Sequence, residues 1–244
     1  MFRLLANGGD AILFPRPSYP LFQFLADLND ARLEFYDLRY RDKRWIIDEA
    51  LFQNVVPAAA KALVTVNPNN PTGSYVKANE VSLLKTFCRK NDLALISDEV
   101  FYDYALEGQP LSLAANAECL TFVVNGLSKV LGLPQMKLSW IVVSGAEPER
   151  TEALKRLEVI ADTYLSVNTP VQQALPSWLA LTERIQAQIL ERIEINLELL
   201  KTCAKEMDGV NVLSVEGGWY AMLSLPDVLG EEEWALKFLQ DAGV

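Results

Sequence analysis

The chain has 244 residues, with 22 Lys or Arg against 32 Asp or Glu, so its formal charge is −10, and it contains no histidine. Without an imidazole there is no Ser-His-Asp triad, no Cys-His pair, no H-E-x-x-H zinc site and no haem with a proximal histidine. An acidic chain without a Lys/Arg-rich run repels nucleic acid and anionic lipid, so we expect small-molecule ligands and neither a nucleic-acid nor a membrane partner.

The cysteines point to a reducing compartment. Cys88, Cys119 and Cys203 are widely spaced and form no C-x-x-C pair, so neither a disulfide framework nor a thiolate metal site is indicated. Half of the residues are apolar, yet no apolar stretch approaches the ~20 residues that cross a bilayer. The sequence therefore predicts a soluble, cytoplasmic protein with reduced cysteines.

Short apolar runs alternate with longer segments of helical period, which is typical of βα units around a mostly parallel, buried sheet. The predicted strands are Ala11–Phe14, Arg32–Tyr36, Ala62–Val66, Leu93–Ser97, Leu120–Val124 and Leu138–Val143. The predicted helices are Tyr19–Leu28, Asp48–Val55, Lys77–Asn91 and Pro148–Tyr164. This order defines an α/β fold.

The last third of the chain follows a different pattern. Between Pro176 and Gly209 there is neither Gly nor Pro, and apolar residues recur at helical spacing, which predicts one long amphipathic helix. Two short strand-like segments, 210–215 and 220–225, follow as a hairpin turned at Gly217-Gly218, and residues 231–240 form a last helix.

These elements predict two units. Residues 1–208 form a large α/β domain with a connecting helix, and residues 209–244 form part of a smaller α+β domain. Residues 2–10 have the pattern of a last helical turn, capped by glycine, whose beginning is missing. Because few elements of the second domain precede Val244, we expect the sequence to be an internal piece of a longer protein.

Polar motifs follow three of the predicted strands. Asn67-Pro-Asn-Asn-Pro-Thr-Gly73 comes directly after one strand, Asp98-Glu99 ends the next, and Ser128-Lys129 follows a third. Each alone has an ordinary interpretation: a turn, a helix cap or magnesium ligand, and a solvated lysine. At the carboxyl ends of parallel strands they share the edge where open α/β sheets bind ligands, and a lysine there is partly desolvated beside a carboxylate.

Together, in this order and spacing, these motifs resemble the class I/II aminotransferases, pyridoxal-phosphate enzymes of fold type I. The resemblance covers essentially the whole chain, including Phe14-Pro-Arg-Pro-Ser-Tyr19-Pro and the Gly217-Gly-Trp-Tyr-Ala stretch. It implies a large domain of mostly parallel sheet flanked by helices, part of a smaller α+β domain, pyridoxal 5′-phosphate as cofactor, and a homodimer acting on an amino acid and a 2-oxo acid.

The resemblance also implies roles for single residues. Lys129 carries the cofactor as a Schiff base and moves the substrate proton, so no histidine is needed. Asp98 pairs with the pyridine nitrogen and keeps it protonated, and Asn70 hydrogen-bonds the ring's 3′ oxygen before Pro71, which in the family commonly follows a cis peptide bond. Tyr19 corresponds to the aromatic residue that stacks on the ring.

For the cofactor phosphate, the resemblance implies contacts from Lys137 and Ser128, and here the sequence departs from the family. Lys137 stands where an arginine is usual, and Gly126 occupies a position, three residues before the lysine, where many members carry a phosphate-binding serine. Phe101 replaces a frequent tyrosine. In the family, a phosphate-binding helix N-terminus lies upstream of the part matched by Met1, and the arginine that binds the substrate carboxylate lies beyond Val244. We therefore expect poor transamination by the 244-residue chain alone.

Two other functions stay open on the sequence. The same fold and lysine also serve pyridoxal-phosphate-dependent lyases, such as carbon-sulfur β-lyases. A non-catalytic, aminotransferase-like regulatory domain is the second alternative. The absence of G-x-G-x-x-G and of a P-loop motif leaves nucleotide binding without a sequence signature.

Overall fold

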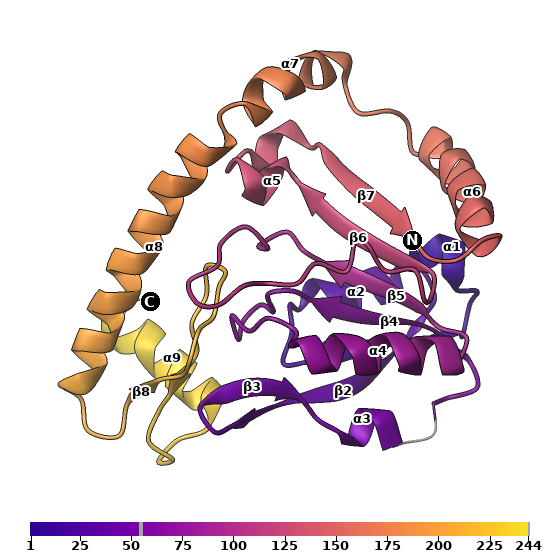
Figure 1. The fold of residues 1–244 in the computed structure, drawn as a ribbon. Helices are drawn as coiled ribbons and strands as arrows, with labels where there is room; N and C mark the ends of the chain where they lie inside the picture. The colour runs from indigo at the N-terminus through magenta and orange to yellow at the C-terminus, as the bar shows by residue number, and fades with distance from the viewer. Residues whose placement is uncertain (54–55, 244) are drawn as a thin grey trace.

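A mostly parallel sheet forms the centre of the molecule in the computed structural model, which describes residues 1–53 and 56–243 (Figure 1). Seven strands of the described residues are ordered β3-β2-β1-β4-β5-β6-β7. Their bounds are β1 Ala11–Arg16, β2 Arg32–Arg41, β3 Arg44–Ile47, β4 Ala60–Val66, β5 Ala94–Asp98, β6 Thr121–Gly126 and β7 Ser139–Ser144. Strands β2, β1, β4, β5 and β6 run parallel, and β3 and β7 are antiparallel edge strands.

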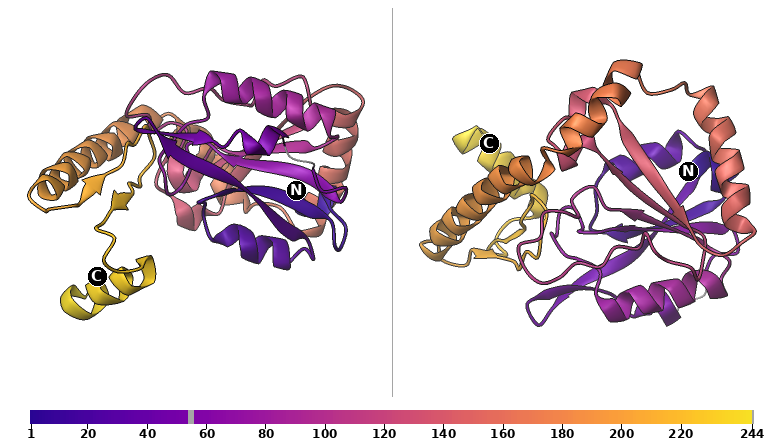
Figure 2. Two further views of the ribbon diagram at one scale, coloured as in Figure 1. Left: turned by 90° about the horizontal axis from the view of Figure 1, so that it is seen from below. Right: turned by 45° about the horizontal axis from the view of Figure 1, so that its top comes forward.

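Helices cover both faces of this sheet, as the left view of Figure 2 shows for α4 and α2. On one side, Leu84 and Phe87 of α4 (Ala78–Lys90) pack on Leu63 and Leu95 of the sheet. On the other side, α1 (Phe2–Leu5), α2 (Leu21–Asp27) and α6 (Glu149–Thr163) pack in a second cluster around Phe14. Burial on both faces explains why the central strands are continuous apolar runs.

Most of the strands and helices predicted up to residue 164 agree with the structure to within two residues at each end, but β2 continues five residues beyond the predicted Tyr36, to Arg41. Two other differences lie in the first half. Residues 44–47 form β3, which the sequence analysis did not predict. The turn into it is made by Asp42 and Lys43, both at positive φ, and it contains no Asn-Gly or Gly pair to signal it. The second predicted helix, Asp48–Val55, begins two residues later than predicted, α3 being Ala50–Gln53, and residues 54–55 lie outside the described residues.

The single long helix predicted from Pro176 is wrong at its start. Helix α7 (Thr169–Leu179) contains Pro176, and a separate helix, α8 (Thr182–Lys205), follows it. At the junction the Thr182 hydroxyl donates to the Leu179 carbonyl (2.8 Å), and Leu181 N donates to the Trp178 carbonyl in a tighter turn. These local bonds compete with continuation of the α7 pattern. A short 3₁₀ turn, η1 (Pro134–Met136), and helix α5 (Leu127–Val130) lie nearby.

The C-terminal segment contains the expected hairpin and last helix. β8 (Asn211–Val212) and β9 (Leu223–Ser224) pair antiparallel about a centre at Gly217-Gly218, and α9 spans Glu231–Ala242. The strands are shorter than predicted because the connection leaves the hairpin to contact the sheet domain (Figure 1). The domain boundary at residue 208 stays a prediction. Across the described residues, no helix has the combination of length and apolar character that would cross a membrane.

Helix α1 ends without the glycine cap that the sequence pattern predicted. Its C-cap residue is Ala6, which is extended. Gly9 lies further on, in a turn at positive φ, and its amide donates to the Asp30 carbonyl (2.8 Å). The glycine therefore shapes the entry into β1 and does not end the helix.

Candidate functional site

The three polar motifs lie together at the carboxyl edge of neighbouring strands. β4, β5 and β6 are adjacent and parallel, and Val66, Asp98 and Val124 form one row across them. The asparagine-rich loop leaves β4, Asp98 ends β5, and Lys129 lies in α5 directly after β6. The topology thus brings together the residues that the sequence placed at three strand ends.

The Lys129 amine lies between two aromatic rings. Its Nζ is 5.3 Å from the centroid of Phe101 and 5.2 Å from that of Trp219, within the range of a cation–π contact. No ion pair formed within residues 1–53 and 56–243 includes Lys129. The Tyr104 hydroxyl donates to the Lys129 carbonyl (2.5 Å), which fixes the backbone of α5. The amine is held in place by apolar surfaces and is not neutralised by a carboxylate.

Asp98 faces a cavity on the α2 side of the sheet. The cavity has a volume of about 390 Å³ and is lined by Asp98, Val124, Phe22 and Tyr164, among others. The Val100 amide donates to Asp98 Oδ1 (3.2 Å). Burial raises the pKa of Asp98 to about 6, the neighbouring Glu99 adds to the rise, and the Val100 bond and the Lys129 charge oppose it. A cationic partner would stabilise the charged form of a carboxyl group in this setting.

The neighbouring carboxylate, Glu99, has a structural role. It is buried on the opposite side of the strand, because successive side chains alternate. Its carboxylate accepts from the Ser97 hydroxyl (2.9 Å), the Ser112 hydroxyl (2.6 Å) and the Leu113 amide (2.9 Å). Glu99 therefore ties the loop after β5 to the sheet and is not available to a ligand.

The asparagines of the β4 loop divide between structure and site. Asn67 is buried, and both ends of its side-chain amide bind the backbone. Its Oδ1 accepts from the Val76 amide (3.0 Å), and its Nδ2 donates to the Leu111 carbonyl (2.9 Å). Asn70 is half-buried, and its bond to Pro71 is cis, as the resemblance implied. Asn69 Nδ2 donates to the Pro17 carbonyl (3.1 Å), whereas its Oδ1 is buried with no partner in the described residues.

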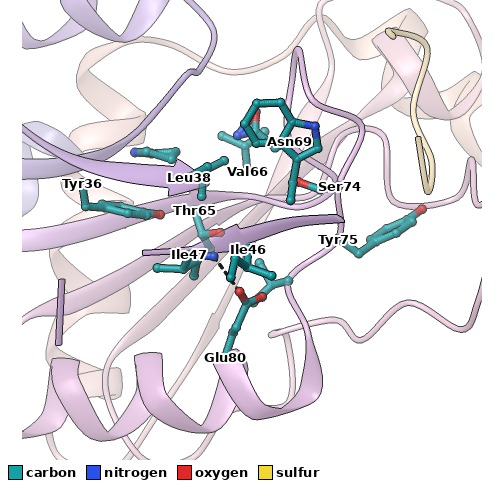
Figure 3. Close-up of a pocket in the computed structure, with 13 residues that line it drawn as sticks. Tyr36, Leu38, Ile46, Ile47, Thr65, Val66, Asn69, Ser74, Tyr75 and Glu80 are labelled. Carbon is teal, nitrogen blue, oxygen red and sulfur yellow. Dashed lines mark hydrogen bonds between the residues drawn. The ribbon is translucent and has the colours of Figure 1, made fainter. Parts of the chain in front are cut away.

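Figure 3 shows a small pocket between this loop and Glu80 of α4. There the Glu80 carboxylate accepts from the Ile47 amide (2.7 Å), and Tyr36, Asn69 and Ser74 line a cavity of about 20 Å³. That volume holds about one water molecule. It has no room for an organic ligand, whereas the cavity beside Asp98 has ligand dimensions.

Tyr19 lies on the loop that Asn69 holds. It is 46% exposed, and its ring packs edge-on against Phe22 (6.4 Å between centroids), which lines the Asp98 cavity. Ser18 Oγ, one residue before it, is buried and has no partner in the described part of the chain. The loop therefore brings an aromatic face and an unused hydroxyl to the site.

The remaining predicted residues follow β6. Ser128 is half-buried in α5, one residue before Lys129. Lys137 is exposed, at positive φ (52°), where η1 ends and β7 begins. Both are near the edge that carries Lys129, but no contact in the structure assigns either a ligand.

Trp219 also lies at the candidate site, although the sequence indicated it only as part of the Gly217-Gly-Trp-Tyr-Ala motif. Its ring packs against Phe101 and Tyr104, each 5.2 Å away between centroids, and forms one wall beside the Lys129 amine. Its buried Nε1 has no partner in the described residues. The signal for this role was the Gly217-Gly218 pair, because only a residue without a side chain lets the backbone approach so closely.

Gly217 is the point where the C-terminal segment meets the sheet domain. A Cβ there would lie 2.6 Å from Tyr75 Cε2 and 2.7 Å from the Tyr104 carbonyl oxygen. We expect Gly217→Ala to lower the free energy of unfolding by about 1–3 kcal/mol, the usual cost of overpacking, and to displace Trp219. Urea denaturation measures it, with Gly8→Ala as the control, because a Cβ at Gly8 meets only Asp30 Cβ at 3.7 Å. Equal stability of both variants would contradict the packing described.

The mostly parallel seven-stranded sheet with helices on both faces is the fold of the pyridoxal-phosphate-dependent transferases of fold type I. The sequence profile "Aminotransferase class I and II" matches residues 1–244. The chain belongs to this family.

Known proteins of the family are similar to the chain over most of its length. An alanine aminotransferase of Mycobacterium tuberculosis is 29% identical over 245 residues, covering 96% of the chain, and AlaA, a glutamate-pyruvate aminotransferase of Haemophilus influenzae, is 30% identical over 76% of it. Among solved structures, alanine aminotransferase from Pyrococcus furiosus superposes with a TM-score of 0.88 at 23% identity, over 98% of the chain and 61% of its own length. The chain spans 56% of the mycobacterial relative and 46% of the Haemophilus one.

Proposed function

We propose that the chain is the cofactor-binding part of an amino-acid aminotransferase that uses pyridoxal 5′-phosphate bound to Lys129. The observation that carries the proposal is the Lys129 amine, held between Phe101 and Trp219 and in no ion pair within the described ranges, at the same sheet edge as the half-buried Asp98. A lysine in this setting is an accessible nucleophile with a polar partner nearby.

The residues present suit this cofactor. Two buried polar atoms near the edge, Ser18 Oγ and Trp219 Nε1, have no hydrogen-bond partner among residues 1–53 and 56–243. Buried polar groups are rarely left unpaired, so such atoms indicate a missing polar ligand. Asp98, whose pKa burial raises to about 6, is the carboxylate for a pyridine nitrogen, and the cavity beside it has ligand dimensions.

In the proposed mechanism each residue has a separate task. Bound pyridoxal phosphate supplies an electron sink for the substrate carbanion. Lys129 Nζ would bind the cofactor covalently and, once free, would take and return the proton at the substrate Cα. Asp98 would hold the proton of the ring nitrogen, Asn70 would donate to the ring oxygen, and Tyr19 would cover one face. Ser128 and Lys137 would bind the phosphate.

The wider properties are proposals as well. Alanine, glutamate and pyruvate are the first substrates to test, because relatives at 29–30% identity carry these names. We propose a homodimer, supported by large apolar side chains exposed near the end of α6, among them Val159 (69%), Tyr164 (72%) and Leu165 (82%). A cytoplasmic location is supported by the free thiols of Cys88, Cys119 and Cys203.

The decisive test combines spectroscopy with mass spectrometry. We expect the chain supplied with pyridoxal phosphate to develop a visible absorbance band, and borohydride to trap one cofactor on the peptide containing Lys129. A trapped adduct on another lysine, or none, would overturn the site assignment.

Product analysis then separates the possible reactions. Conversion of the bound cofactor to its amine form by alanine, reversed by pyruvate, supports transamination. Release of ammonia and a 2-oxo acid without an acceptor indicates a lyase. Cofactor capture with neither reaction indicates a regulatory domain or a chain that needs further residues for turnover.

A further inference from the structure

Gly126 and Ser139 compete for the same space. They are directly opposed in the antiparallel pairing of β6 and β7. A Cβ built on Gly126 would lie 2.8 Å from Ser139 Cβ, 3.0 Å from Ser139 Cα and 3.0 Å from the Leu138 carbonyl oxygen. Real Cβ atoms do not approach this closely, so a serine at 126 and a serine at 139 cannot coexist without a shift of the strands.

Ser139 faces the side of the sheet that carries the cavity. In an antiparallel pair, opposed residues send their side chains to the same face, and the face alternates along each strand. Phe122 lies four residues before Gly126 on β6 and is opposed to Val143 on β7. These two side chains pack together in the cluster on the α2 side. Val124, two residues further along, lines the Asp98 cavity. Ser139, opposite Gly126, is the next position on that face.

The row formed by Gly126 and Ser139 lies next to the helix that carries Lys129. Gly126 is the last residue of β6, and α5 with Lys129 begins immediately after it. On β7, Ser139 is the first residue and is exposed, and Lys137 precedes it by two positions. By contrast, Leu138 turns to the other side, into a cluster with Leu127 and Val171. A hydroxyl and a lysine thus flank the start of β7 at the edge where Lys129 is carried.

We propose that Ser139 binds the phosphate group of the cofactor, in place of the serine that Gly126 lacks. Compared with the family pattern, the hydroxyl is carried by the opposed position of β7 and not by β6. The absence of a side chain at Gly126 leaves room for it. A serine hydroxyl donates one hydrogen bond to a phosphate oxygen and needs no charge of its own. This inference rests on the proposed function and names a positioning residue for its cofactor.

The test compares the affinities for pyridoxal phosphate and for pyridoxal, which lacks the phosphate. Loss of one hydrogen bond to a charged group weakens binding by about 10- to 100-fold. We expect Ser139→Gly to weaken binding of pyridoxal phosphate by that factor and to leave pyridoxal binding within about 2-fold. Ser82→Ala on the outer surface of α4, whose hydroxyl bonds only the Ala78 carbonyl in the described residues, is the control and keeps both affinities.

A swap of the two residues tests the shared space. Gly126→Ser alone should lower the Tm, because its Cβ meets Ser139 Cβ. Adding Ser139→Gly should recover part of the Tm and of the affinity for pyridoxal phosphate, since the hydroxyl returns to β6. A double variant that is no better than Gly126→Ser contradicts the exchange.

The outcomes separate this inference from the proposed function. If the unchanged chain forms no adduct at Lys129 with either aldehyde, the proposed function fails. If adducts form and Ser139→Gly binds pyridoxal phosphate normally, or loses both ligands equally, the role of Ser139 is wrong. Inorganic phosphate gives a readout without Lys129: it should raise the Tm of the unchanged chain more than that of Ser139→Gly, and equal shifts overturn the inference.

Discussion

Replacing Lys129 by alanine should abolish the covalent cofactor adduct and lower any turnover by at least about 10²- to 10⁴-fold, the usual contribution of a positioned proton-transfer group. The reason is the geometry of the site: the Lys129 amine is the group held between Phe101 and Trp219, next to the strand that ends in Asp98. Visible absorbance, borohydride trapping and single-turnover kinetics measure the loss.

Two further variants show whether the loss is chemical. Lys129→Arg keeps a cation between the two rings, so its fold should be intact, but a guanidinium stays protonated and forms no adduct. Lys90→Ala removes an exposed lysine at the end of α4 and should leave binding unchanged. Adduct formation by Lys129→Ala at the wild-type rate, on whichever lysine, would show that Lys129 is not the nucleophile.

The fold could be predicted because its main signals are local. The central strands are buried on both faces, so each is an apolar run, and the helices between them have helical period. The missed β3 has no turn signature, since Asp42 and Lys43 adopt positive φ without a glycine or asparagine. At the break between α7 and α8, local bonds from the Thr182 hydroxyl and the Leu181 amide occur at a position where the helical pattern of the sequence continues. Such single bonds leave little trace in periodicity.

The site was partly predictable for a related reason. Lys129, Asp98 and Asn70 follow strands, so their meeting at one edge follows from parallel topology. Trp219 comes from the C-terminal hairpin, more than 80 residues after Lys129 along the sequence, and local pattern cannot place such a long-range contact. The exchange between Gly126 and Ser139 depends on the register of β6 and β7, which becomes visible only when the two strands are paired.

Asp98→Asn should lower turnover by about 10²- to 10³-fold, the cost of removing one well-placed electrostatic partner. In the proposed site the carboxylate would hold the proton of the cofactor's ring nitrogen, whereas a neutral amide has no charge to stabilise it. We expect the variant still to bind the cofactor on Lys129, because the amine is untouched. Separate measurement of adduct formation and of amino-group transfer distinguishes the two effects.

The same substitution should stabilise the cofactor-free chain above pH 6. Burial raises the pKa of Asp98 from 3.8 to about 6, so between these values the folded chain binds more protons than the unfolded chain. Stability contributed by protonated Asp98 is therefore complete below pH 4 and is lost as pH rises through about 6, a change on the order of 3 kcal/mol. Asparagine does not titrate, so the free energy of unfolding of Asp98→Asn should exceed that of the unchanged chain by a growing amount over this pH range. Urea unfolding at several pH values measures this difference.

The two effects of Asp98→Asn have one cause, and this makes the prediction specific. A partly buried carboxylate that forms no ion pair within the described residues costs stability in the empty site, and it would contribute to binding once the ring nitrogen is beside it. Cofactor should therefore raise the Tm of the unchanged chain more than that of Asp98→Asn. The difference in Tm between the two should then become smaller or change sign. Asp92→Asn, at an exposed position after α4, should alter neither curve. An Asp98→Asn variant that is less stable than the unchanged chain at pH 8 without cofactor would show that Asp98 serves the fold and not a ligand.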